Sequence, residues 1–247
     1  MAHRLILSNS ILELIPYDAE NNKFLSYDNH NHKFWALFTY EGNIIKQHIL
    51  TILPHYTHIY LNNCGINNNN LWCINDLHFI ELLDLSNNYI YDLSPINNIK
   101  LHSLSLQNNF ITNINNLITL SSLTYLDISH NKIEEFDIHH LTNLKYFNCS
   151  HNKIKRISLD NDNLLYLNIS FNNIDDINIS SISLLTLQGR NNNISNIISL
   201  LQCPNLEDIR FEYNKITDIS CISYLKNLKN FNIDNNNVSK FTICNII

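Results

Sequence analysis

The stretch LDISHNKI, residues 126–133, places three apolar residues, Leu126, Ile128 and Ile133, at fixed distances from one asparagine, Asn131. The same arrangement returns as FNCSHNKI from residue 147, LNISFNNI from residue 167 and LDLSNNYI from residue 83. Aligned on L-x-x-L-x-L-x-x-N-x-I, the chain contains nine such windows, which start at Tyr56, Ile80, Leu101, Leu123, Leu144, Leu164, Leu184, Leu206 and Leu228. Their starts are 20 to 24 residues apart. A period of this length predicts a solenoid in which each window is one structural unit.

The asparagine at the ninth position of each window is predicted to be structural. The first part of a window alternates apolar and polar residues, as a strand with one buried face does, and the asparagine falls where the chain leaves that strand. Its amide has two donors and one acceptor, which can satisfy backbone groups of a buried turn. Stacked turns would then form an asparagine ladder from Asn88, Asn109, Asn131, Asn152, Asn172, Asn192, Asn214 and Asn236, with Cys64 at this position in the first window.

These windows closely resemble the leucine-rich repeat family over residues 56–247. Repeats with tails such as TDISCISYLKNL, residues 217–228, are most similar to the short internalin-like and phosphatase-regulator-like subtype. The resemblance implies one short parallel strand per repeat and a right-handed solenoid with a concave sheet, which is α/β by family convention but mostly β. Only nine to thirteen residues separate the windows, so the convex side is predicted to be 3-10 turns or extended chain. The segments 155–163 and 175–180 are expected to contain no helix.

The two ends of the chain are predicted to differ from the repeats. Residues 1–55 lie outside the pattern, and their segments 4–15 and 32–50 have the composition of strands. Solenoids need their end cores covered, so residues 1–55 are interpreted as an amino-terminal cap, with a small β-rich functional module as the alternative. Residues 56–247 are the repeat domain. The carboxy-terminal FTICNII, residues 241–247, has no evident cap and offers an edge for self-association.

The composition narrows the class of protein and its location. There are 45 asparagines but only 3 glycines and 4 prolines, which is typical of an AT-rich genome, such as that of a protist or a large DNA virus with a leucine-rich-repeat gene family. A net charge of −6 disfavours a nucleic-acid partner. We see no signal-peptide pattern and no apolar run of membrane-spanning length. The six cysteines form no C-x-x-C pair, so free thiols and a cytoplasmic location are expected.

Catalytic and metal-binding patterns are missing from the sequence. It contains no Gly-rich phosphate loop, no G-x-S-x-G and no H-E-x-x-H. The paired histidines have no matching cysteine or carboxylate spacing and are interpreted as surface imidazoles; they are His30 with His32, His55 with His58, and His139 with His140. We therefore expect no enzymatic activity, no cofactor and no metal site.

The remaining candidate is the concave face, where window positions two, three, five, seven and eight are expected to lie. Position three holds three consecutive tyrosines, Tyr125, Tyr146 and Tyr166, and position eight contributes His130, His151, Phe171 and later Tyr213. Charged residues follow toward the carboxy terminus: Arg190, Asp208, Arg210 and Glu212. Exposed aromatic clusters dominate binding hot spots, although adjacent tyrosines also stabilise a sheet by cross-strand packing. Gly189, at a core position, is expected to be compensated by Phe211 one repeat later.

The leading functional hypothesis is a non-catalytic scaffold that binds a protein partner on the concave face. A phosphatase regulatory subunit is an alternative that the family resemblance implies. An adaptor or effector that recruits other machinery through residues 1–55 is a second alternative, and a secreted adhesin would need a signal sequence and an anchor.

Overall fold

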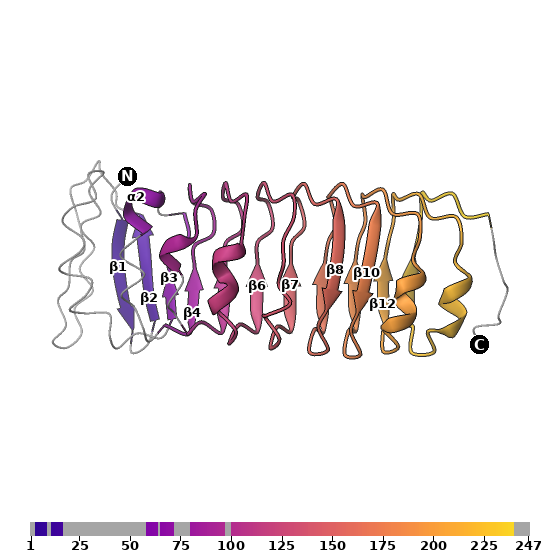
Figure 1. The fold of residues 1–247 in the computed structure, drawn as a ribbon. Coiled ribbons are helices and arrows are strands. Elements are labelled where there is room, and N and C mark those ends of the chain that lie inside the picture. Colours follow the sequence, from indigo (N-terminus) through magenta and orange to yellow (C-terminus); the bar gives the residue numbers. More distant parts are fainter. Residues whose placement is uncertain are drawn as a thin grey trace.

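Short parallel strands, one per window, run side by side along the molecule in a computed structural model that describes residues 3–8, 11–16, 58–63, 65–71, 80–96 and 100–239 (Figure 1). Each strand occupies positions three to five of its window. The strands are β3 (His58–Tyr60), β4 (Leu82–Asp84), β5 (Ser103–Ser105), β6 (Tyr125–Asp127), β7 (Tyr146–Asn148), β9 (Tyr166–Asn168), β11 (Thr186–Gln188), β12 (Asp208–Arg210) and β13 (Asn230–Asn232). Neighbouring strands pair in the register of the windows, so the predicted leucine-rich-repeat solenoid is confirmed.

Two further strands extend this sheet at its amino-terminal end. β1 (His3–Ser8) pairs with β2 (Ile11–Pro16) in antiparallel fashion, and β2 lies parallel to β3 in an eleven-stranded sheet. The strands expected within residues 4–15 are therefore confirmed. The second expected segment, 32–50, lies outside the described residues, so the role of residues 1–55 as a cap or module stays a prediction. At the other end β13 is the last described strand, and FTICNII also lies outside the described part.

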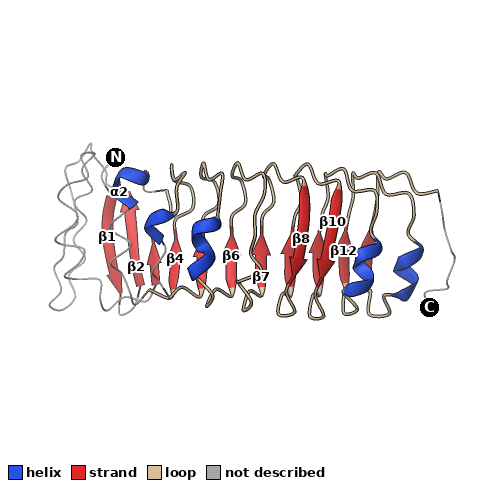
Figure 2. Cartoon of the chain, viewed as in Figure 1, coloured by secondary structure: helices blue, strands red, loops and turns tan. Residues whose placement is uncertain are grey.

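The segments that connect the windows are short helices or extended chain, as predicted (Figure 2). Among the described residues, four of them form 3-10 helices: η3 (Ser94–Ile96), η4 (Asn115–Thr119), η5 (Ile198–Gln202) and η6 (Ser220–Tyr224). The two segments expected to contain no helix form strands instead, β8 (Arg156–Asp160) and β10 (Asp176–Ser180), which pair in parallel. A single α-helical turn, α2 (Asn68–Leu71), was not expected. Across the described residues, none of the helices has the length and apolar content that crossing a membrane requires.

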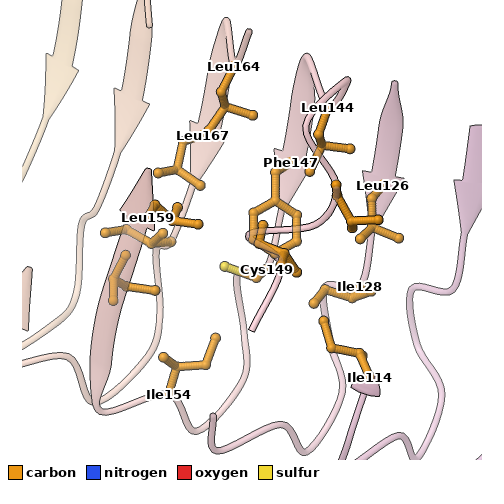
Figure 3. Close-up of a cluster of buried hydrophobic side chains, with 14 of the residues drawn as sticks. Ile114, Leu126, Ile128, Leu144, Phe147, Cys149, Ile154, Leu159, Leu164 and Leu167 are labelled. Atoms are coloured by element: carbon orange, nitrogen blue, oxygen red, sulfur yellow. The ribbon is translucent and has the colours of Figure 1, made fainter. Parts of the chain in front are cut away.

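The apolar positions of the windows fill a continuous interior. Leu126, Leu144, Phe147 and Cys149, from adjacent repeats, point toward one another and are fully buried (Figure 3). Burial of one such aliphatic side chain contributes about 1.5–3 kcal/mol, and each repeat adds several of them to the core.

The predicted compensation at Gly189 is confirmed. A Cβ atom at Gly189 would collide with the ring of Phe211, which occupies the space that a larger residue fills in the other windows. Phe211 itself is fully buried. The two core positions are therefore coupled across the β11–β12 pair.

The asparagines at position nine connect each repeat to the one before it. In its own repeat the Nδ2 of Asn131 donates to the carbonyls of Ile128 and Ser129, at 3.0 and 3.1 Å. The same nitrogen lies 2.9 Å from the carbonyl of Leu106, and its Oδ1 accepts the N–H of Ile111 at 2.9 Å, both in the preceding repeat. The corresponding amide-to-carbonyl bonds recur at Asn88, Asn109, Asn152, Asn172, Asn192, Asn214 and Asn236.

Candidate functional site

Three tyrosines form one stacked column on the outward side of the long sheet, which we call the sheet face. Because β6, β7 and β9 pair in register, Tyr125 lies opposite Tyr146, and Tyr146 lies opposite Tyr166. The first two rings have centroids 4.4 Å apart and an interplanar angle of 7°. The second pair has values of 4.5 Å and 1°. The tyrosine column is half-buried, and since Tyr146 is stacked on both faces, it is the edges of the rings that are left for contact with a partner.

The phenols of this column are held in their neutral form. Burial raises the pKa of Tyr125, Tyr146 and Tyr166, and it is the largest cause for each. The carboxylate of Asp127 raises the pKa of Tyr125 further. At neutral pH the column is therefore an uncharged aromatic surface that carries hydroxyl groups, able to take part in both apolar contacts and hydrogen bonds.

A second column is formed at position eight by His130, His151 and Phe171. The two imidazole rings stack with centroids 4.0 Å apart and an interplanar angle of 12°, and His151 stacks on Phe171 at 4.2 Å and 11°. The guanidinium carbon of Arg190 lies 5.1 Å from the centroid of the Phe171 ring, within cation–π range. We call these three rings the His/Phe column. Tyr213 does not extend it, because Asn191 occupies position eight in the intervening repeat.

Position eight has a property that the sequence analysis missed. The backbone is left-handed there in all nine windows, with φ between 54° and 60°. Asparagine tolerates this conformation and occupies the position in five windows: Asn63, Asn87, Asn108, Asn191 and Asn235. The other four windows carry His130, His151, Phe171 and Tyr213; histidine is also enriched in this conformation, so the strain is greatest at the bulky Phe171 and Tyr213. The signal was present in the sequence as the recurring asparagine, and strain of this kind concentrates at functional sites.

The expectation that position seven is displayed on the concave face is wrong for four serines. Ser86, Ser129, Ser150 and Ser170 are buried. The preceding polar residue at position five accounts for this, because its side-chain oxygen accepts the backbone N–H of the serine two residues on. Asp127 does so for Ser129 at 2.9 Å, and Asn168 does so for Ser170 at 3.0 Å. Positions five and seven therefore form tight local turns, and the aromatic surface narrows to positions three and eight.

A pocket of about 200 Å³ lies where the His/Phe column meets the charged repeats. It is lined by Ser150, His151, Asn168, Ser170, Phe171, Gln188, Arg190 and Arg210. Two of these residues are cationic and none is anionic. The nearby carboxylate of Asp208 instead accepts two bonds from Arg210, to Nε at 3.2 Å and to Nη2 at 3.1 Å. The fourth charged residue of the prediction, Glu212, is partly buried.

Outside the sheet face, one cluster of metal-ligand types occurs among the described residues. Asp137, His139 and His140 place one potential ligand atom each within 4.8 Å of the others. The interpretation that the pair His139 and His140 has no matching carboxylate spacing is therefore wrong, since Asp137 precedes His139 by two residues. The Asp137 carboxylate accepts the backbone N–H of His139 at 3.1 Å and also contacts its ring, and these hydrogen bonds lower the pKa of Asp137. A local turn between two exposed residues accounts for Asp137 and His139, whereas both ring nitrogens of His140 are buried, so the interpretation of His140 as a surface imidazole is wrong.

Comparisons with known proteins agree with this architecture. The family model described as leucine-rich repeats (2 copies) matches residues 99–139. A search of curated proteins finds no match. The functional domain of InlJ from Listeria monocytogenes is 24% identical with a TM-score of 0.67, over 77% of this chain and 42% of that chain. Internalin C2 from Listeria monocytogenes is 28% identical with a TM-score of 0.61, over 73% of this chain and 81% of that chain.

A third similar structure is that of the LRIM1/APL1C complex, at 20% identity and a TM-score of 0.66 over 76% of this chain and 41% of that chain. This chain spans less than half the length of the InlJ and LRIM1/APL1C chains that it matches. The similarity therefore concerns the repeat architecture.

Proposed function

Because the chain is a leucine-rich-repeat protein, we propose that it is a non-catalytic scaffold that binds a partner protein on the sheet face, which is the concave face expected from the sequence. The observation that carries the proposal is the pair of aromatic columns, stacked over three consecutive repeats. Tyrosine offers a large contact area and a hydroxyl group at low cost in side-chain entropy, and such residues dominate binding hot spots.

The strained backbone at position eight favours binding over sheet stability as the reason for the second column. Asparagine occupies this position in five windows and tolerates the left-handed backbone, so stability alone would favour it throughout. A bulky residue such as Phe171 costs conformational energy there, of order 1–3 kcal/mol. Stacking between neighbouring rings offsets part of this cost, about 0.5–1.5 kcal/mol per pair. A partner that contacts the exposed ring edges is the remaining benefit.

A protein is the favoured class of partner. Charges of both signs lie next to the columns, with Arg190 and Arg210 beside Asp208. Protein interfaces have a polar rim of this kind around their core. The LRIM1/APL1C structure, which has a similar fold, is itself a complex. We place the interaction in a reducing compartment, because Cys149, Cys203 and Cys221 are free and buried.

The experiment compares the wild-type chain with Tyr146→Ala and with Tyr224→Ala. Tyr224 is the matched control, since it is 72% exposed and lies on η6, outside the columns. Partners are captured from a cell lysate, identified by mass spectrometry, purified and titrated by calorimetry. We expect Tyr146→Ala to weaken binding by about 2 kcal/mol or more, roughly thirtyfold in Kd, while Tyr224→Ala binds as wild type. Equal affinity of the two variants, with folding verified by circular dichroism, would reject the concave face.

A further inference from the structure

The pocket at the end of the His/Phe column has a charge that the columns themselves do not have. We infer that it receives an anionic side chain of the partner, a carboxylate or a phosphate, while the adjacent segment of the partner lies across the aromatic columns. This inference rests on the proposed function and adds to it the chemical class of the bound group.

Arg190 is the first reason. It stands at position seven, where four other windows have a buried serine, and it is exposed. Within the described residues its guanidinium has no ion pair and no side-chain hydrogen bond, and it lies over the face of the Phe171 ring. A guanidinium that lies against a ring keeps its N–H edge available, and that edge matches the two oxygens of a carboxylate or phosphate.

Arg210 supplies a second cation whose direction is fixed. Asp208 holds it through Nε and Nη2, which uses two of the five N–H groups of the guanidinium. The other three remain for a ligand. Asp208, and Glu212 as a further acidic neighbour, reduce the net charge around Arg210, but neither carboxylate lines the pocket.

Ser170 is the third reason. It lines the pocket and is only 3% exposed. Its Oγ has no hydrogen-bond partner among the described residues. The equivalent hydroxyl of Ser129 donates to Asp127 at 2.6 Å. A buried hydroxyl without a partner costs free energy, and an anion in this pocket would give it an acceptor.

The volume fits a group of this size. The pocket has a volume of about 200 Å³. One water occupies roughly 30 Å³ in the liquid, so the pocket can hold a phosphate or carboxylate together with waters. Arg190 and Phe171 border the same space, so an anion attached to an aromatic or aliphatic stem would meet both a cation and a ring.

The test uses the full chain with 15N-labelled arginine and two small anionic probes, phenyl phosphate and benzoate, with benzamide as the uncharged comparison. The arginine Nε–H signals are followed by NMR during each titration. We expect at least one anion to shift the Arg190 and Arg210 signals saturably, while benzamide does not. Saturation by phenyl phosphate alone would support a phosphate as the bound group, and equal saturation by benzoate would support a carboxylate.

Two pairs of variants separate the pocket from general charge and folding effects. Arg190→Gln should weaken binding of the anionic probe about tenfold or more, whereas Arg156→Gln, on the exposed side of β8, should leave the affinity unchanged. Ser170→Ala should weaken binding of the probe about threefold without lowering the thermal midpoint of unfolding. Ser129→Ala should lower the midpoint and keep the affinity, because it removes a bonded hydroxyl outside the pocket.

An absent saturable shift in the wild type, or equal affinity of Arg190→Gln and Arg156→Gln, overturns the inference. If Tyr146→Ala still loses the partner in that case, the scaffold function stands without the anion pocket. If Tyr146→Ala binds the partner as wild type while the anion titrations succeed, the proposed surface fails and the pocket remains as an isolated anion site.

Discussion

The imidazole rings of His130 and His151 stack with centroids 4.0 Å apart while both residues have a left-handed backbone, each with φ of 54°. The two facts have opposite energetic signs. The backbone conformation costs of order 1–3 kcal/mol per residue, and the ring contact returns about 0.5–1.5 kcal/mol for the pair. For histidine, which is enriched in this conformation, the stacking offsets much of the cost, whereas Phe171 in the next repeat carries the larger strain.

Tyr213 offers the clearest measure of the backbone strain. Its φ is 58°, its side chain is 57% exposed, and no ring contact with another described residue is recorded, so little is lost when the side chain is shortened. We expect Tyr213→Asn to raise the free energy of unfolding by about 1 kcal/mol in urea denaturation, because asparagine tolerates the conformation. Tyr224→Asn on η6 is the control and should not stabilise. A destabilised Tyr213→Asn would mean that the tyrosine makes stabilising contacts that outweigh the strain.

The stability of the fold should fall in mild acid because of His151. Burial lowers the pKa of His151, and the neighbouring His130 and Arg190 lower it further. An unfolded histidine titrates near 6.5, so as the pH falls below about 6.5 the unfolded chain binds a proton first and stability is lost. His151→Phe keeps a ring at this position, as Phe171 does in the next repeat, but removes the proton.

Chemical denaturation from about pH 7.5 to about pH 5.5 measures this effect. The free energy of unfolding of His151→Phe should depend less on pH than that of the wild type. Part of the dependence should remain, since burial also lowers the pKa of His140. Identical pH profiles for the two proteins would exclude His151 as a source.

The sequence predicted the register of the sheet because the repeat itself determines it. Once Asn131 and Asn152 are aligned, Tyr125 must lie opposite Tyr146, and the structure has this pair. The backbone at position eight left only an indirect signal, the recurring asparagine, because φ follows from how the turn closes against the next repeat. The pocket could not be predicted from the sequence either, because it depends on Arg190 being exposed at a position where the serines of other windows are buried.

The asparagine ladder can be tested at two adjacent asparagines. Asn172 is buried and its amide reaches the carbonyls of Cys149 and Ile169, while its Oδ1 accepts the N–H of Ile154. The next residue, Asn173, is exposed. We expect Asn172→Ala to lower the free energy of unfolding by about 1–3 kcal/mol, because it leaves buried backbone groups unpaired. Asn173→Ala should change it by less than about 0.5 kcal/mol. Equal effects in urea denaturation would remove the ladder as a source of stability.

Gly189 and Phe211 should behave as one unit in a double-mutant cycle. Gly189→Ala places a methyl group against the Phe211 ring and should cost about 1–3 kcal/mol through overpacking. Phe211→Leu alone leaves space beside a glycine and should also destabilise, by the loss of buried ring area. In the double variant the methyl group occupies part of that space, so the two costs should sum to more than the measured loss by about 1 kcal/mol or more. Additive losses in urea denaturation would show that the two repeats accommodate each change independently.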